Sequence, residues 1–142
     1  MPLSRDDDMR ALLTGVRRIA MVGASAKPDR PSHGVMRFLL DHGWHVIPVN
    51  PGLVGQSILG QTVVASLSEI DPPVDMVDIF RNSEAAADAV DEAIAHRARA
   101  VWLQLGVINP VAAARAESAG LEVVMDRCPK IEIRRLAIRG PA

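Results

Sequence analysis

The chain has 142 residues, a formal net charge of −1, 49% hydrophobic residues and one cysteine. This length fits one domain with a sizeable core, and the balanced charge without a long basic run argues against a nucleic-acid surface. One cysteine excludes an intrachain disulfide and is typical of a cytoplasmic protein. We expect neither a signal peptide in the acidic N-terminus nor a membrane span, because no apolar run approaches the length that crosses a bilayer.

Helical and strand patterns alternate along the chain. Acidic residues 6–8, followed by apolar residues at helical spacing, predict an opening helix that ends near Gly15. Short apolar runs predict five strands, at 19–22, 46–49, 74–80, 101–105 and 121–125. Apolar stripes, cap residues and terminal glycines predict the later helices at 32–41, 82 to about 97, 111–119 and, as a helix or turn, 130–138.

A less regular segment lies between the second and third strands. Residues 51–61 contain three glycines and a proline, which favour turns, and residues 62–65 predict a short extra strand. Ser66 followed by Glu69 has the spacing of a capped helical turn. In the third strand, 74–80, the two aspartates at positions 75 and 78 face opposite ways, so at least one must lie near a strand end or find a partner.

This order of elements predicts an α/β fold, namely a single Rossmann-like domain over 1–142 whose core covers about 17–132. The sheet is expected to be doubly wound, five-stranded and mostly parallel. A ligand of such a sheet lies at the carboxyl edge of the strands, where the strand order reverses. The loops expected at this edge are 23–32, 50–55, 80–83, 106–109 and 126–130.

The loop after the first strand has the features of a phosphate site. Gly23 allows the backbone to turn sharply and to approach a ligand closely. Ser25 and Ser32 supply hydroxyl groups. Lys27 and Arg30 add positive charge beside the N-terminus of the next helix, whose dipole favours an anion. The alternative is a plain connection between strand and helix that binds no ligand.

The spacing in this loop is not the dinucleotide fingerprint. G-x-G-x-x-G would require glycine at positions 25 and 28, where the chain has Ser25 and Pro28. The second strand ends in Asn50-Pro51, without the acidic residue that would bind a ribose hydroxyl. Both features weigh against NAD as the ligand.

Five segments, each at the carboxyl edge of the expected sheet, resemble the small stand-alone CoA-binding proteins. The segments are VGASAKPDRPSHGV, VIPVNPG, DMVDIFR, VWLQLGV and VVMDRCPKIE. The fold of that family is similar to the N-terminal CoA-binding domain of the succinyl-CoA synthetase α subunit. The resemblance covers residues 17–132 and implies coenzyme A, or an acyl-CoA, as the ligand.

The same motifs imply which residues hold the cofactor. The resemblance assigns the phosphates to the first loop, the nucleotide side to the end of the second strand, the adenosine or pantetheine to the end of the third, and the far end of the ligand to the last two loops. In that order the residues are Gly23, Ala24, Ser25, Lys27, Arg30 and Ser32; Asn50 and Pro51; Ile79, Phe80 and Arg81; and Gly106, Arg127, Cys128 and Pro129.

The chain departs from the synthetase pattern in one place. The synthetase domain has a CoA-binding lysine early in the second strand region, where this chain has Trp44 and His45. The chain also lacks the second domain of the synthetase, which argues against ligase activity. We therefore expect a CoA carrier, sensor or partner subunit. The alternatives are a nucleotide-dependent oxidoreductase, a fragment of an acyl-CoA ligase, or an interaction protein with a decayed site.

Several single residues have two interpretations. Cys128 is either a packed loop cysteine or a thiol that forms a mixed disulfide with CoA. His33 either contacts a phosphate or lies exposed in a loop, and Arg81 either contacts a phosphate or pairs with Glu84. Glu132 more often fixes a loop than acts as an acid or base. No metal-ligand spacing or catalytic triad is present, so we expect neither a metal nor catalytic residues. Proteins of related fold often form dimers, so a homodimer is a possible state of this chain.

Overall fold

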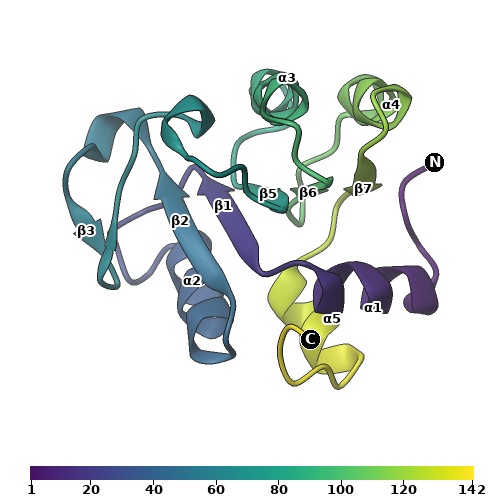
Figure 1. The fold of residues 1–142 in the computed structure, drawn as a ribbon, viewed down its shortest axis with the longest axis horizontal. Coiled ribbons are helices and arrows are strands. Elements are labelled where there is room, and N and C mark those ends of the chain that lie inside the picture. Colours follow the sequence, from purple (N-terminus) through teal and green to yellow (C-terminus); the bar gives the residue numbers. More distant parts are fainter.

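The computed structural model describes residues 1–142 and confirms the expected Rossmann-like, doubly wound α/β fold (Figure 1). The five strands of the sheet lie in the order β2-β1-β5-β6-β7, and every neighbouring pair is parallel. They are β1 Arg18–Val22, β2 His45–Val49, β5 Met76–Ile79, β6 Ala100–Leu103 and β7 Glu122–Val124.

The helices lie close to the expected ranges. They are α1 Asp6–Gly15, α2 Pro31–Asp41, α3 Ala86–His96, α4 Pro110–Ser118 and α5 Pro129–Arg135. None of these helices is long and apolar enough to cross a membrane. Between β2 and β5 lie the shorter elements: the 3-10 turns η1 Pro51–Leu53 and η2 Leu67–Glu69, and the strands β3 Ser57–Ile58 and β4 Gln61–Thr62.

Helices cover both faces of the sheet (Figure 1). Because side chains alternate between the two faces of a strand, the buried residues separate into two apolar clusters. One cluster contains Leu12 of α1, Met36 of α2 and Ile133 of α5, and the other contains Val90 of α3 and Ala113 of α4. The helices α1, α2 and α5 therefore cover one face and α3 and α4 the other, which explains why the strands are apolar on both sides.

Local signals decide where two of the helices begin. Asn109 caps α4 as expected: its Oδ1 accepts the N–H of Ala112 at 3.0 Å, and Pro110 occupies the first helical position. The expected start of α3 at Asn82 is too early. The Oδ1 of Asn82 accepts the N–H of Ala85 at 2.8 Å and holds a turn, after which the helix begins.

The segment between β2 and β5 is where the sequence-based expectations are least accurate. A single strand over 62–65 is wrong, because β3 and β4 form a separate antiparallel hairpin and Val64 makes only one bridge, to Val49. The turn η2 is present, but Ser66 does not cap it. The Oγ of Ser66 lies 2.7 Å from the Oγ of Ser68 instead.

The two aspartates at β5 lie in different environments. Asp75, just before β5, accepts hydrogen bonds from the backbone N–H groups of Arg17 and Arg18 at 2.8 and 2.9 Å, so it lies at a strand end with partners, as expected. Asp78 is completely buried inside β5, and neither carboxyl oxygen has a hydrogen-bond partner.

Candidate functional site

The candidate site lies where the order of the strands reverses. From β1 the chain passes through α2 to β2 on one side, and after the hairpin it returns to β5 on the other side of β1. The loops that follow β1 and β5 diverge here at the carboxyl edge of the sheet. Ligands of doubly wound sheets bind at such a point.

Gly23 forms the turn that ends β1. Its φ is +86°, and a Cβ added at this position would lie 2.2 Å from the carbonyl oxygen of Phe80. The backbone of the first loop is therefore packed directly against the end of β5, and only glycine fits. Hydrogen bonds on both sides hold this junction: Gly23 N–H donates to Val49 O and Phe80 N–H to Val22 O, at 3.0 and 2.8 Å.

A polar pocket of about 390 Å³ opens beside this turn. Three amide N–H groups at the pocket, those of Ala24, Ser25 and Ser32, have no hydrogen-bond acceptor in the chain. Lys27 and Arg30 line the same pocket, at the N-terminus of α2. Unpaired amides and cations at a helix N-terminus form an environment that favours an anion.

Asn50, at the end of β2, holds the wall of the polar pocket. Its Nδ2 donates to Ala24 O and its Oδ1 accepts from Gly52 N–H, both at 2.8 Å. The Asn50 side chain thus joins the first loop to η1. Because Nδ2 and Oδ1 each make a hydrogen bond within the protein, Asn50 positions the loop that carries the unpaired amides.

An apolar pocket of about 390 Å³ adjoins the polar one, and Pro31 and Phe80 line both. Its other walls include Val35, Leu105 and Ile131. Gln104, at the carboxyl end of β6, is 7% exposed, lines this pocket and has an Oε1 without a hydrogen-bond partner. Buried polar atoms normally have partners, so this oxygen is a free acceptor in a mostly apolar pocket, whose one charged lining residue is Arg81.

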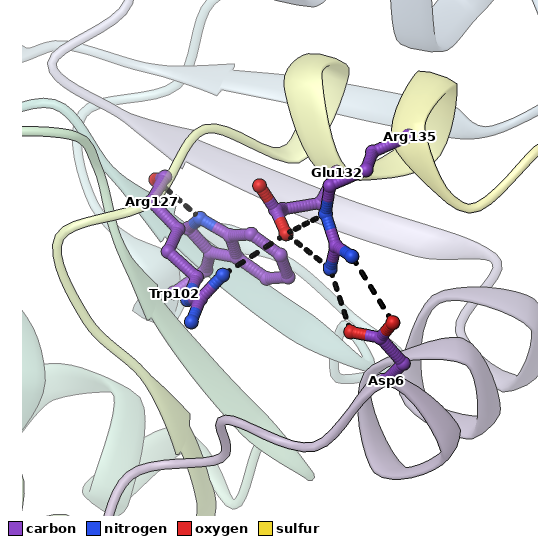
Figure 2. A network of polar contacts seen from close by, with 5 residues as sticks. All are labelled: Asp6, Trp102, Arg127, Glu132 and Arg135. Atoms are coloured by element: carbon purple, nitrogen blue, oxygen red, sulfur yellow. Dashed lines mark hydrogen bonds and ion pairs between the residues drawn. The ribbon is translucent and has the colours of Figure 1, made fainter.

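A network of polar contacts fixes the loop that brings Cys128 to the apolar pocket (Figure 2). The Nε1 of Trp102 donates to the carbonyl oxygen of Arg127 at 2.7 Å. The Oε1 of Glu132, which is 6% exposed, accepts from Arg127 Nη1 at 3.1 Å and from Arg135 Nη2 at 2.8 Å. Arg135 also forms a bidentate pair with Asp6 of α1. The hydrogen bonds from Arg135 lower the pKa of Asp6. Glu132 therefore has the loop-fixing role.

Comparison with known proteins gives the family. The family model described as a CoA binding domain matches residues 17–134, which is most of the chain. The chain belongs to the CoA-binding domain family. Membership supports CoA binding in general and confirms the resemblance seen in the sequence.

Two relatives of this CoA-binding domain protein match it over most of both chains. The YneT protein of Bacillus subtilis is 39% identical over 124 residues, which cover 87% of this chain and 90% of YneT. The crystal structure of Prb, the PH1109 protein redesigned for binding, is 39% identical with a TM-score of 0.91, over 96% of this chain and 95% of that one.

A larger protein contains the same fold. The dinucleotide forming acetyl-coenzyme A synthetase 1 of Ca. Korarchaeum cryptofilum matches 84% of this chain with a TM-score of 0.71. The sequences are 22% identical, and the match covers 28% of the synthetase. The likeness extends to the fold alone.

Most of the expected site residues of this CoA-binding domain protein lie together. Those at the polar pocket are Gly23, Ala24, Ser25, Lys27, Arg30, Ser32, Asn50 and Phe80, and those at the apolar pocket are Phe80, Arg81 and Cys128. Five expected residues line neither pocket, and one of them, Arg127, pairs with Glu132 instead. Ile79 is fully buried among the residues facing α3 and α4, Pro129 is buried at the start of α5, and Pro51 and Gly106 lie in exposed turns.

Two further expectations need correction. His33 is not an exposed loop residue: it is 7% exposed and lines neither pocket of the candidate site. Arg81 forms no ion pair with Glu84 and faces the apolar pocket. The apolar pocket also includes Gln104, which was not among the expected residues. A polar residue at the end of an apolar strand is a pattern from which this site residue could have been predicted.

Proposed function

We propose that the protein binds coenzyme A, or an acyl-CoA, across the two adjoining pockets. The observation that carries this proposal is the shared wall of Pro31 and Phe80, which joins a polar pocket with unpaired donors to an apolar pocket with one unpaired acceptor. Coenzyme A has the same two parts: a nucleotide diphosphate, and a pantetheine arm that is largely apolar but contains amides. The protein then acts as a carrier, sensor or partner subunit and contributes no catalytic residues of its own.

The polar pocket fits the diphosphate. The amides of Ala24, Ser25 and Ser32 supply hydrogen-bond donors without any rearrangement, and Lys27 and Arg30 neutralise the charge. Because the donors are already held in place by the Gly23 turn and by Asn50, little ordering entropy opposes binding.

The apolar pocket fits the pantetheine arm. An amide N–H of the arm satisfies the Oε1 of Gln104, and the methyl and methylene groups pack on Val35 and Ile131. Cys128, 8% exposed, lines the same pocket. As a secondary proposal, Cys128 forms a mixed disulfide with CoA. Mass spectrometry after incubation with CoA disulfide tests this proposal, and the lack of an adduct on Cys128 would contradict it.

Calorimetry of the full chain with CoA, acetyl-CoA, NAD and ATP tests the proposal. We expect CoA to bind and the Lys27→Ala/Arg30→Ala double variant to lose at least roughly tenfold in affinity, because each charge-assisted hydrogen bond contributes about 1.5–3 kcal/mol. Arg5→Ala/Arg139→Ala is the charge-matched control and should bind CoA as the parent does. Binding of NAD but not CoA would favour the oxidoreductase alternative, and no binding at all would favour the decayed site.

A second variant tests the apolar pocket separately. Gln104→Leu should weaken CoA binding but leave the affinity for ADP, which lacks the pantetheine arm, unchanged. An equal loss for both ligands would show that the arm does not occupy this pocket.

Two further expectations stay predictions. One is the cytoplasmic location, which the single cysteine supports, and the other is the pairing of two copies as a homodimer. Sedimentation of the purified 15.3 kDa chain tests the pairing.

A further inference from the structure

A third pocket of about 350 Å³ lies between α2 and α5. Its walls include His33, Arg37 and His42 from the α2 side and Lys130 and Arg134 from α5. It shares no lining residue with either pocket of the proposed CoA site. The family resemblance and the proposed function give this pocket no role.

The pocket is strongly basic although the whole chain has a net charge of −1. It gathers three cations, Arg37, Lys130 and Arg134, around one carboxylate, that of Asp41. None of these four side chains takes part in an ion pair. Cations held close together repel one another unless an anion or water lies between them. The unbalanced charge therefore favours an anionic occupant.

Phe38 lies beneath two of the three cations. The Nζ of Lys130 lies 5.9 Å from the centroid of its ring and the Cζ of Arg134 lies 5.3 Å from it, both within the range of a cation–π interaction. The imidazole of His42 stacks on the same ring at a centroid distance of 4.0 Å. One buried aromatic ring thus lies beside three of the groups that line the pocket, which favours their present arrangement.

His33 is the second observation that points to a ligand. It is 7% exposed and lines this pocket, yet neither of its ring nitrogens forms a hydrogen bond within the chain. Buried polar side chains normally have partners. Two other histidines have a partner in the chain: Nδ1 of His42 lies 2.7 Å from Phe38 O, and Nε2 of His96 accepts the Val74 N–H at 2.9 Å. The ring nitrogens of His33 have no partner in the chain and are not sealed off from solvent, so they are free to bind an occupant of the pocket.

We propose that the pocket between α2 and α5 binds a phosphate group, as inorganic phosphate or as a small phosphomonoester. Guanidinium groups such as those of Arg37 and Arg134 match the geometry of phosphate oxygens and form paired hydrogen bonds with them, and Lys130 adds a point charge. His33 donates a ring N–H to the same anion. The volume exceeds that of phosphate alone and leaves room for the organic part of an ester.

The test follows the ring signals of His33 by NMR in the full chain, without phosphate buffer and at constant ionic strength. Inorganic phosphate and glycerol 3-phosphate are the two probes. We expect saturable shifts of the His33 signals with at least one of them; tighter binding of glycerol 3-phosphate would identify an ester as the ligand class, and equal or weaker binding would identify inorganic phosphate. No saturable shift with either probe would overturn the proposal.

Three variants locate the binding. Arg37→Ala/Arg134→Ala should lower the phosphate affinity at least tenfold, whereas Asp41→Asn should raise it several-fold because it removes the only carboxylate. A gain of affinity cannot result from misfolding. Lys27→Ala/Arg30→Ala should leave the His33 shifts unchanged even where CoA binding is lost, so that failure of the CoA site and failure of this pocket are distinguished. Shifts that follow Lys27 and Arg30 instead would overturn the proposal.

Discussion

Asp78 is an acidic side chain in the middle of a parallel sheet. It lies between Met21 of β1 and Trp102 of β6 in the register of the strands and is fully buried. Burial raises its pKa well above the usual value for aspartate, because no donor or cation compensates the lost hydration of the charged form. Between the ordinary aspartate pKa and this raised one, the folded protein therefore holds Asp78 in its neutral, protonated form.

This protonated state makes stability depend on pH. In the unfolded chain Asp78 loses its proton above about pH 3.8, while in the folded chain Asp78 keeps the proton until the pH passes the raised pKa. Over that interval the unfolded state binds fewer protons. The free energy of unfolding thus falls as pH rises, by about 1.4 kcal/mol per pH unit for one such group.

Asp78→Asn should remove this slope, since Asn carries no titratable proton. Urea unfolding of both proteins at pH 4.5, 5.5 and 6.5 measures the difference in the free energy of unfolding. We expect the variant to gain about 1.4 kcal/mol per pH unit relative to the parent within the interval. Asp75→Asn, at a position already paired with backbone N–H groups, is the comparison and should not produce such a gain. Parallel pH profiles for parent and Asp78→Asn would contradict the interpretation.

At the scale of elements, polar contacts help to dock α5. It has seven residues, and the buried Glu132 joins it through arginines to the loop before it and to α1 (Figure 2). Glu132→Gln keeps the shape but removes the charge. We expect a loss of about 1–2 kcal/mol in the free energy of unfolding, less than for a fully buried pair because Arg127 and Arg135 are 35% and 42% exposed.

Urea unfolding at pH 7 measures this loss, and Asp6→Asn is the matched control. Asp6 binds the same Arg135 but is 57% exposed, so its replacement should cost less than that of Glu132. If the two variants lost equal stability, the burial of Glu132 would not be what makes the network important.

The elements also show what the sequence can specify. Asn109-Pro110 and Gly23 act within a few residues, so their cap and turn were predictable. The face that a side chain occupies was harder to predict. Ile79 and Phe80 are neighbours on alternating sides of a strand, and only Phe80 reaches the site. Ser32 and His33 are about 100° apart around α2, so one faces the proposed CoA site and the other faces α5.

Across the whole molecule, the sequence predicted the sheet and its carboxyl-edge loops but not the joining of two pockets. Gln104 and Ile131 are 27 residues apart and meet only because β6 and α5 pack on the same side of the site. Such long-range meetings depend on packing that no local pattern specifies. The proposed ligand therefore contacts both halves of the chain, from Gly23 after β1 to Cys128 before α5.

A ligand that joins distant segments should stabilise the fold as a whole. At a free CoA concentration of 100 times the dissociation constant, the free energy of unfolding should rise by about 2.7 kcal/mol, which for a chain of this size raises the melting temperature by roughly 5–10 °C. Differential scanning calorimetry with increasing CoA measures the shift. Lys27→Ala/Arg30→Ala should melt at nearly the parent temperature without CoA, since both side chains are exposed, and should show little shift with it. A shift of parent size in that variant would mean that CoA stabilises the protein from a different site.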